Sequence, residues 1–372
     1  MTESDQPRPG AAATAASEQT VMAAWQTLAP LMDLITPMAL RVAATLRLAD
    51  YLPDDGAGAG VAVADLAARA GAEPEALARM LRHLVARGVF TEPRPGEFAA
   101  NPTAALLRTD QPASIRAWLD LDGFGGRMDL AFTGLTHTGL AHTGLDHTGL
   151  AHTVRTGEPA WETVFGQPFW SYLEANPPLG ASFDALMASD ADYRAALADG
   201  YDWTGIHHVI DVGGGTGRLL ADVLAHNPQL RGTLLDLPET AARGREYLAG
   251  RGLEARCDVA GQSFFDPLPA GADAYLLNRV IHDWDDARAS LILRRCAEAA
   301  GRRGRVLVIE SHLNSGGESA SFAEMNLRML VLSGGRERTL DDYAALATEA
   351  GLRVAAVHQA TDRHVIIEAV AA

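Results

Sequence analysis

Cysteine and positive charge are both scarce in this sequence. Its 372 residues include two cysteines, Cys257 and Cys296, which argues against a disulfide framework and fits a reducing cytoplasm. Lysine and arginine number 31 against 47 aspartates and glutamates, so the formal net charge is −16. A protein that binds nucleic acid through phosphate contacts needs clustered positive charge, and we therefore expect no nucleic-acid partner.

Long uncharged apolar runs are also missing. No such stretch approaches the length needed to cross a bilayer, and the N-terminus lacks the basic patch and apolar run of a secretory signal. Hydrophobic residues nevertheless make up 48% of the chain, enough to bury a sizeable core. These features predict an acidic, soluble, cytoplasmic protein with no membrane partner.

The N-terminal third is predicted to be mostly helical. Residues 1–18 are rich in Ala, Thr, Ser and Pro and are expected to form a disordered tail. Apolar residues then recur at helical spacing from Val21 to Tyr51, where Pro37, which lacks a backbone donor, is expected to separate two helices. Two short helices follow over 61–71 and 73–89, and then two strand-like pieces joined by a turn over 91–101.

That order of elements resembles a winged helix-turn-helix. Such a module can bind DNA through its second helix, as in a ligand-sensing regulator, or serve as a packing and dimerisation module. The second helix does carry basic side chains, namely Arg79, Arg82, His83 and Arg87. Because the chain as a whole is strongly acidic, we favour a dimerisation domain over 19–125, and we expect a homodimer.

Residues 126–200 are expected to be linker helices that contain an inserted repeat. A five-residue unit recurs over 132–153 and places histidines at equal intervals, at His137, His142, His147 and His152. A metal site is one interpretation, because imidazole is a common ligand. Five residues advance a helix by about 140° beyond a full turn, so the four rings would not share a face. An expanded repeat in an exposed segment is therefore favoured, and no metal is expected.

From His207 onward, short apolar runs alternate with helix-like segments. This alternation predicts a parallel sheet covered on both faces, within an α/β domain over 201–372. Two more strands are expected near the C-terminus, over 352–358 and 364–370. Ligands of such sheets bind at the carboxyl ends of the strands, so the polar residues that follow each strand are the candidates for a site.

The most informative motif follows the first of these strands. Glycines 213, 214, 215 and 217 come directly after Asp211, and glycine lets the backbone bend tightly and approach a ligand. A dinucleotide fingerprint would need a third glycine at the position that Arg218 occupies. The second strand ends at Asp236, whose carboxylate can accept both hydroxyls of an adenosine ribose. In the third strand region over 261–269, Phe264 sits where an adenine ring could stack, and Ser263 could hydrogen-bond to the edge of the base. By residue type alone, a phenylalanine of the core is an equal alternative for Phe264.

A candidate proton acceptor follows the fourth strand. His282 lies at the edge of the sheet where ligands bind, and a histidine there can take up a proton near neutral pH. A base of this kind needs a neighbour that fixes its tautomer and stabilises its charged form. Either Glu310, at the end of the fifth strand, or Glu337, in a later turn, could serve.

Together these residues resemble the class I S-adenosyl-L-methionine-dependent O-methyltransferases that act on small molecules. The likeness is greatest to bacterial anthracycline-type enzymes and extends over nearly the whole chain. It predicts an α/β fold with a C-terminal Rossmann-like methyltransferase sheet and an N-terminal, mostly helical winged-helix dimerisation domain. The segments that carry it are TPMALRVAATLRLADYL, VRTGEPAWETVFGQPFWSYL, ASFDALM, YDWTGIHHVIDVGGGTG and NLRMLVLSGGRERT.

The resemblance also implies roles for individual residues. The S-adenosyl-L-methionine site would comprise Asp211, Gly213, Gly214, Gly215, Asp236, Leu237, Ser263, Phe264 and Asn278. The catalytic group would comprise His282, Glu310 and Glu337, and the aromatic acceptor would contact Trp170, Asp283, Asn326 and Met329. The sequence departs from the family in having Ser263 and Asn326 where Asp is common. His282 matches the phenolic methyltransferases, whereas the anthracycline-type enzymes generally lack this histidine.

The reaction implied is transfer of a methyl group to a phenolic or enolic oxygen of an aromatic natural product. A free phenol, with a pKa near 10, is mostly protonated at neutral pH, so His282 would act as the general base. The alternative, also implied by the resemblance, is a hydroxylase or decarboxylase of the aclacinomycin 10-hydroxylase type. Such an enzyme keeps the cofactor but transfers no methyl group.

Overall fold

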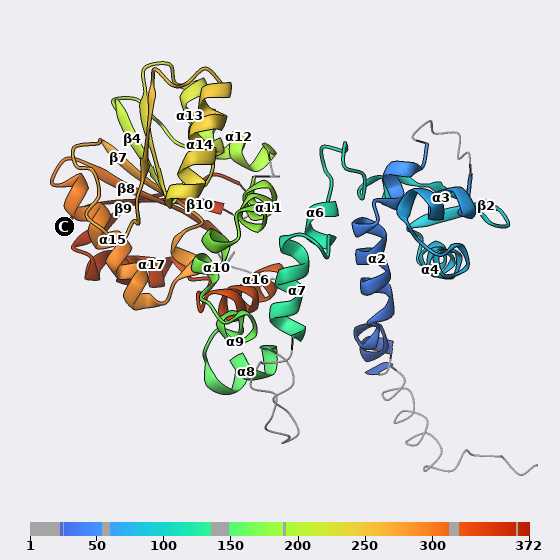
Figure 1. Ribbon diagram of the computed structural model, residues 1–372. Helices are drawn as coiled ribbons and strands as arrows, with labels where there is room; N and C mark the ends of the chain where they lie inside the picture. The colour runs from blue at the N-terminus through green and yellow to red at the C-terminus, as the bar shows by residue number, and fades with distance from the viewer. Residues whose placement is uncertain are drawn as a thin grey trace, which may run out of the picture. The chain divides into compact units, whose positions relative to one another are not determined.

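The structure, a computed structural model, describes residues 23–24, 26–53, 60–134, 149–188, 191–311, 320–361 and 364–372. The predicted tail over 1–18 and the repeat histidines His137, His142 and His147 lie outside these residues. The chain divides into two compact units, Met1–Leu121 and Asp122–Ala372, whose elements are labelled in Figure 1.

The first unit opens with a helical segment that breaks earlier than predicted. A 3₁₀ turn, η1 (Ala29–Met32), precedes α2 (Ile35–Thr45) and a second turn, η2 (Leu48–Tyr51). The carboxylate of Asp33 accepts the backbone N–H groups of Ile35 and Thr36 at 2.9 and 3.1 Å and so caps α2. The break therefore lies at Asp33–Leu34 and not at Pro37, which is tolerated inside the first turn because no intrahelical donor is needed there.

The rest of the first unit has the predicted winged-helix fold. It comprises β1 (Val61–Ala62), α3 (Val63–Ala70), α4 (Pro74–Ala86), β2 (Phe90–Arg94), β3 (Glu97–Ala100), α5 (Pro102–Ala105) and α6 (Arg116–Leu119). The three strands form an antiparallel sheet in the order β1-β3-β2. Leu66, Leu81 and Phe98 are completely buried between this sheet and the helices, and they form part of one apolar core.

One stretch of the first unit bears on the membrane prediction. Gln26–Thr45 has the length and mean hydropathy, 1.2, of a candidate membrane span, and 18% of it is buried. It contains Asp33 and Arg41, so the expectation that no long uncharged stretch exists still holds. Length and composition are weak evidence for a membrane span, because apolar helices of soluble proteins meet the same criteria.

The second unit begins with helices that enclose an aromatic cluster. These are α7 (Phe124–Thr133), α8 (Gly149–Thr156), α9 (Ala160–Phe165), α10 (Phe169–Ala175), α11 (Pro177–Met187) and α12 (Ala191–Asp199). Phe124 packs against Trp161, Phe169 and Phe183 with ring centroids 4.8–6.2 Å apart. Aromatic contacts of this kind join α7, α9, α10 and α11 into one layer.

A seven-stranded sheet forms the centre of the second unit. Its order is β6-β5-β4-β7-β8-β10-β9, with the first five parallel and β10 antiparallel to both neighbours. The strands are β4 (His208–Val212), β5 (Arg231–Asp236), β6 (Cys257–Gly261), β7 (Ala274–Asn278), β8 (Arg305–Ser311), β9 (Leu352–Gln359) and β10 (His364–Ala371). Since the chain runs outward from β4 to β6 and then returns to β7, the crevice for a ligand is expected where β4 and β7 end.

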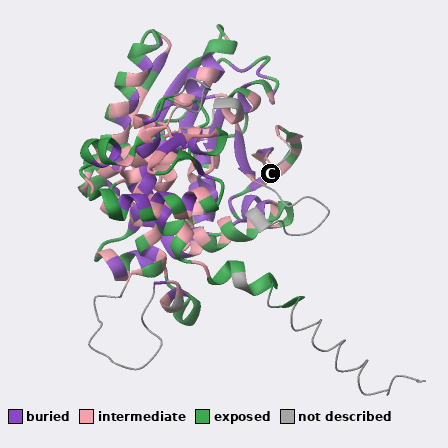
Figure 2. Cartoon of the chain, turned by 90° about the vertical axis from the view of Figure 1, so that its right-hand side faces the viewer, coloured by how far each residue is buried: buried purple, intermediate pink, exposed green. Residues whose placement is uncertain are grey.

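Helices cover both faces of this sheet, as predicted. They include α13 (Arg218–His226), α14 (Pro238–Gly250), α15 (Asp286–Ala300) and α17 (Leu340–Glu349). The 3₁₀ turn η3 (Ile281–Asp283) follows β7, and α16 (Ala320–Leu332) packs against α7, α8 and α9. Two apolar cores result, one with α15 and α17 and the other with α12, α13 and α14. Figure 2 shows the strands of the sheet as mostly buried and the outer sides of the helices as exposed.

The third strand differs in position from the prediction. β6 ends at Gly261, so the segment over 262–269 is the loop that follows the strand. The strand, CDVAG, contains one charged residue, Asp258, and two small residues, Ala260 and Gly261, so it lacks the long apolar run that marks its neighbours. Ser263 and Phe264 consequently lie at the carboxyl end of β6, beside the predicted crevice.

Candidate active site

The glycine loop connects β4 to α13 at the edge of the sheet. Gly213 and Gly217 have φ values of +70° and +75°, which favour glycine, and the N–H of Gly213 donates to Leu235 O at 2.8 Å. A Cβ at Gly214 would collide with the carboxylate of Asp211. The loop therefore presents bare backbone at the end of the strand, as a bound cofactor would require.

Asp236, at the end of β5, is held against this loop. One of its carboxylate oxygens accepts the N–H of Gly215 at 2.8 Å, and the other accepts the N–H of Leu237 at 2.7 Å. Burial raises the pKa of Asp236 to about 7. Each oxygen retains a further lone pair, so the carboxylate can still accept ribose hydroxyls.

Asp211 lies below the glycine loop and is 1% exposed. Neither of its carboxylate oxygens has a hydrogen-bond partner among the residues that the structure describes. Burial, together with the nearby charge of Asp236, raises the pKa of Asp211 to about 7. A buried carboxyl group without a partner is costly, which is the pattern expected where a ligand supplies the missing donor.

The predicted adenine-side residues, Ser263 and Phe264, lie beyond β6, and Asn278, predicted for the ribose or methionine end of the cofactor, ends β7; two of the three side chains already make hydrogen bonds. The ring of Phe264 is 3.3 Å from where a Cβ on Gly213 would be, and it packs edge-on against Trp284 at 5.8 Å. The hydroxyl of Ser263 already accepts the N–H of Phe265 at 3.2 Å. Asn278 Oδ1 accepts the hydroxyl of Tyr193 at 2.8 Å.

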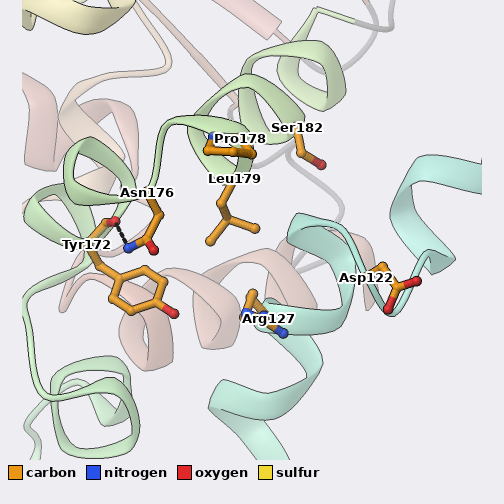
Figure 3. A pocket seen from close by; sticks show the side chains of 7 residues that line it. All are labelled: Asp122, Arg127, Tyr172, Asn176, Pro178, Leu179 and Ser182. Carbon is orange, nitrogen blue, oxygen red and sulfur yellow. Dashed lines mark hydrogen bonds between the residues drawn. The ribbon is translucent and has the colours of Figure 1, made fainter.

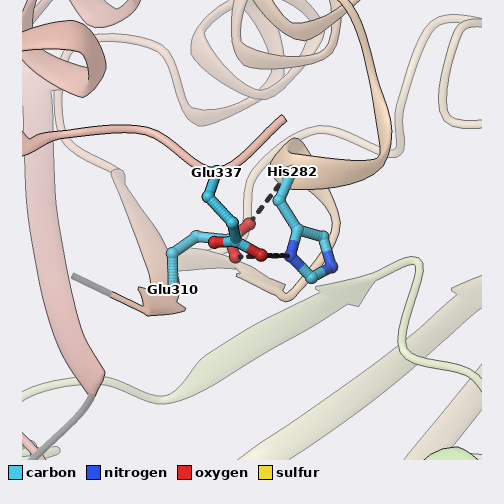
Figure 4. Close-up of side chains that lie close together, drawn as sticks. All are labelled: His282, Glu310 and Glu337. Atoms are coloured by element: carbon cyan, nitrogen blue, oxygen red, sulfur yellow. Dashed lines mark hydrogen bonds and ion pairs between the residues drawn. The ribbon is translucent and has the colours of Figure 1, made fainter. Parts of the chain in front are cut away.

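His282 is part of η3, a short turn after β7, and it is surrounded by carboxylates. Its Nδ1 lies 2.9 Å from Glu337 Oε1 and 3.6 Å from Glu310 Oε2 (Figure 4). Glu310 instead uses Oε1 to accept the backbone N–H groups of Ile281 and His282 at 3.0 and 3.2 Å. Of the two helpers that the sequence left open, Glu337 therefore contacts the imidazole and Glu310 supports the turn.

The electrostatics of this group favour a strongly basic imidazole. Burial on its own would lower the pKa of His282, but the charges of Glu310, Asp283 and Glu337 outweigh it and raise the pKa to about 9. Burial raises the pKa of Glu310 to about 7 and that of Asp283 to about 6. The other ring nitrogen, Nε2, lies 3.6 Å from Asp283 Oδ1, outside hydrogen-bond distance.

The four predicted acceptor residues lie in three places. Asp283 is next to His282 in η3. Trp170 stacks on Trp284 with ring centroids 6.2 Å apart, and its buried indole N–H has no partner within the described part of the chain. Asn326 and Met329, on α16, are tied to the loop that carries Glu337. Asn326 Oδ1 accepts the N–H of Glu337 at 3.0 Å, and the carbonyl of Met329 accepts backbone N–H groups of residues 333–335.

Comparison with known proteins decides the family. The profile of the O-methyltransferase domain matches residues 147–353, and that of the O-methyltransferase dimerisation domain matches residues 30–110. The chain belongs to this family of O-methyltransferases. The family, the enzyme class and the fold predicted from the sequence are thereby confirmed.

Individual relatives match this methyltransferase over most of its length. The 2,7-dihydroxy-5-methyl-1-naphthoate 7-O-methyltransferase of Streptomyces carzinostaticus is 46% identical, over 89% of this chain and 93% of its own. Aclacinomycin 10-hydroxylase RdmB of Streptomyces purpurascens is 45% identical, over 87% and 83%. The structure of NcsB1, an O-methyltransferase from neocarzinostatin biosynthesis in complex with S-adenosylmethionine and 2-hydroxy-5-methyl naphthoic acid, superposes with a TM-score of 0.81 at 43% identity, covering 92% and 98% of the chains.

Two residues of the site were not predicted from the sequence. Tyr193, on α12, donates a hydrogen bond to Asn278, which is 85 residues away in the sequence, and its ring centroid lies 4.5 Å from that of His364. Arg338 is fully buried next to Glu337. Tyr193 has no local sequence signal, whereas Arg338 stands inside the GGRERT segment that contributed to the family resemblance.

A cavity of about 240 Å³ lies elsewhere in the methyltransferase unit (Figure 3). Its lining comes from α7, α10, α11 and adjoining turns: Asp122, Arg127, Tyr172, Asn176, Pro178, Leu179 and Ser182. None of the predicted site residues is among them. The cavity is therefore separate from the predicted catalytic group around His282, at the carboxyl edge of the sheet.

Proposed function

We propose that this methyltransferase transfers the methyl group of S-adenosyl-L-methionine to a phenolic or enolic hydroxyl of an aromatic natural product, with His282 as the general base. The observation that carries this proposal is the 2.9 Å contact between His282 Nδ1 and Glu337 Oε1. With Nδ1–H donating to the carboxylate, Nε2 carries the lone pair that can accept a proton. S-adenosyl-L-methionine supplies the electrophilic methyl group.

The residues around the imidazole suit removal of a phenolic proton. The raised pKa of His282, about 9, makes the imidazole nearly as basic as a phenolate, whose conjugate acid has a pKa near 10, so the proton transfer is close to balanced. Near pH 7 the neutral, active form of the imidazole is then the minor one, and activity should rise at higher pH. Glu337 stabilises the imidazolium that forms, and Glu310 holds the turn in place through two backbone N–H groups. The atoms of these three residues lie close enough together to hold a metal ion, but Glu337 already occupies Nδ1, and the mechanism needs no metal.

The acceptor hydroxyl would lie between the methyl group of the cofactor and this base, because in-line transfer needs the acceptor oxygen next to the methyl carbon. The glycine loop, Asp236, Leu237, Phe264 and Asn278 would hold the adenosine and methionine parts, with Ser263 contributing less because its hydroxyl is engaged. The stacked Trp170 and Trp284 would form a flat wall for a planar acceptor. A hydroxylated polycyclic aromatic acid fits this wall and agrees with the naphthoate acceptor named for one relative.

The first unit would serve as the dimer interface. Its exposed apolar side chains are concentrated over 28–38, with Leu31, Leu34 and Ile35 each at least 70% exposed. An exposed apolar surface of this kind typically marks a protein–protein contact. We infer a homodimer of a cytoplasmic biosynthetic enzyme that binds neither nucleic acid nor membranes.

Mass spectrometry tests the reaction directly. Incubation with S-adenosyl-L-methionine and a panel of hydroxylated aromatic polyketides should yield a product heavier by one CH₂. His282→Ala should reduce turnover by at least roughly 100-fold, as expected for loss of general-base catalysis. His226→Ala, an exposed histidine on α13, is the matched control and should retain wild-type turnover. Unchanged turnover in His282→Ala would exclude His282 as the base.

One relative keeps a second reaction open. RdmB is described as a hydroxylase, and it is nearly as similar to this chain as the naphthoate methyltransferase. With a cofactor labelled in its methyl group, methyl transfer places label in the aromatic product. A hydroxylase would instead consume oxygen and leave the product unlabelled.

A further inference from the structure

Arg338 is a completely buried arginine in the loop that carries Glu337. Its side chain has 0% exposure, and it is among the largest fully buried side chains of the described residues. An arginine always carries its charge, and burial is tolerated only if the guanidinium donors are satisfied. The partners of these donors therefore indicate what the side chain holds in place.

Most of the donors of Arg338 bind the turn that contains His282. Nη1 donates to the carbonyl of Ile281 at 2.9 Å, and Nη2 donates to the carbonyl of Trp284 at 2.7 Å. Nε and Nη2 also donate to Asp286 Oδ1, at 3.1 and 2.8 Å, in the first residue of α15. The guanidinium thus binds the residue before His282 and the residue after Asp283, so both ends of the turn are fixed.

The backbone before Arg338 contacts the same turn. The N–H of Arg336 donates to the carbonyl of His282 at 2.8 Å, and a Cβ at Gly335 would collide with that carbonyl oxygen. The loop over 335–338 and the turn over 281–284 are therefore in direct backbone contact. Any movement of one relative to the other changes the distance between Glu337 and His282.

We propose that Arg338 is a positioning residue that fixes the hydrogen bond between Glu337 and His282. The inference rests on the proposed role of His282 as the base. The two bonded side chains are 55 residues apart in the chain, so their distance depends on how the two segments dock. Arg338 belongs to one segment and binds both ends of the other. A misplacement of about 1 Å at an active site can reduce the rate about 100-fold.

The test compares three variants. Arg338→Met keeps the length of the side chain and removes all its donors, whereas Arg338→Lys keeps the charge and can bind only some of the carbonyls. Arg256→Met is the matched control, because Arg256 likewise donates to backbone carbonyls, those of Leu224, Asn227, Pro228 and Leu230, at a loop that contains no predicted site residue.

We expect Arg338→Met to lower kcat by about 10- to 100-fold with KM and the affinity for S-adenosyl-L-homocysteine unchanged. Arg338→Lys should recover part of this loss. Arg256→Met should lower the melting temperature and leave kcat unchanged. A melting temperature that falls in Arg338→Met while kcat stays at the wild-type value would overturn the proposal.

Titration of His282 provides a readout that does not depend on activity. In ligand-free enzyme with labelled histidine, NMR should show the His282 resonance, assigned through His282→Gln, titrating at lower pH in Arg338→Lys than in the wild type. The lysine variant carries this measurement because it keeps the positive charge, whose loss in Arg338→Met would by itself raise the pKa of His282. An unchanged titration in Arg338→Lys would overturn the proposal. If His282→Ala retains turnover while Arg338→Lys shifts the titration, the base assignment fails and the positioning role stands.

Discussion

Glu337 accepts a hydrogen bond from His282 at 2.9 Å, and both side chains are almost completely buried, at 1% and 6% exposure. Glu310, equally buried, lies farther from the same nitrogen, at 3.6 Å. The two glutamates therefore make different contacts although the sequence presents them as equivalent. One faces the imidazole, and the other faces the backbone that carries it.

This difference predicts separate effects for the two glutamates. Glu337→Gln removes a negative charge that touches the ring, so the pKa of His282 should fall, and the pH dependence of kcat should move to lower pH with a reduced maximum.

Glu310→Ala leaves two buried backbone N–H groups without a partner, at a cost of about 1–3 kcal/mol each in stability. Thermal unfolding should show a larger loss in Glu310→Ala than in Glu337→Gln. The opposite ranking would contradict these assignments.

The pH dependence of turnover follows from the raised pKa of His282. Only the neutral imidazole can accept a proton, so kcat/KM, which reports ionisations of the free enzyme, should increase with pH through a midpoint near 9. Measurements of kcat/KM from pH 6 to 10 would show this rise. A profile that is flat over this range would mean that removal of a proton by His282 does not limit the rate.

Stability should change with pH in the opposite direction. The pKa of His282 in the folded protein is raised from 6.5 to about 9, so its contribution to the free energy of unfolding is complete below about 6.5 and disappears as pH rises through about 9. Unfolding of the ligand-free enzyme by denaturant should therefore show a decline over this window. In His282→Gln the free energy of unfolding should fall less over this window. If it falls as steeply as in the wild type, the decline does not come from His282.

The glycine loop should tolerate no side chain at position 214. In Gly214→Ala the added methyl group would meet the Asp211 carboxylate and Leu234, so the loop must move, at a cost of about 1–3 kcal/mol. Calorimetry should show that binding of S-adenosyl-L-homocysteine is lost or greatly weakened. Gly250→Ala, at a helical position where no atom of the described residues lies within 4 Å of the new Cβ, is the control and should bind normally. Normal binding by Gly214→Ala would remove the loop from the cofactor site.

The exposed apolar residues over 28–38 should be required for dimer formation. Light scattering of the wild type should give twice the monomer mass of 39.4 kDa. Replacing both Leu31 and Leu34, which are 76% and 77% exposed, by Asp places two charges in the expected interface and should yield the monomer. Val154→Asp, at another exposed apolar position, should leave the dimer intact. A wild-type monomer would exclude the homodimer.

Much of the fold could be predicted because its signals are local. The strand and glycine loop around Asp211, the strand that ends at Asp236 and the helix–turn–helix that precedes residue 90 each show their pattern within about 20 residues. The prediction of a helix break at Pro37 is wrong because the break depends on the capping of α2 by the side chain of Asp33, which the sequence pattern does not show. The predicted position of the third strand is wrong because the sequence of β6, CDVAG, lacks an apolar run.

The catalytic group could be predicted only in part. The sequence indicates which residues follow strands, but the distances from His282 to Glu310 and Glu337 depend on how separate segments pack. Tyr193 could not be found for the same reason, because its partner Asn278 is remote in the chain. The domain boundaries and the roles of the individual site residues remain predictions.

The bond between Asn326 and the loop of Glu337 has a consequence for redesign of acceptor specificity. Helix α16 carries Asn326, whose Oδ1 accepts the backbone N–H of Glu337 at 3.0 Å, and it also carries the predicted acceptor residue Met329. A chimaera that receives the whole helix from a relative with a different acceptor would change both at once. Grafts that vary the surrounding positions but keep the asparagine are the ones expected to exchange selectivity without loss of turnover.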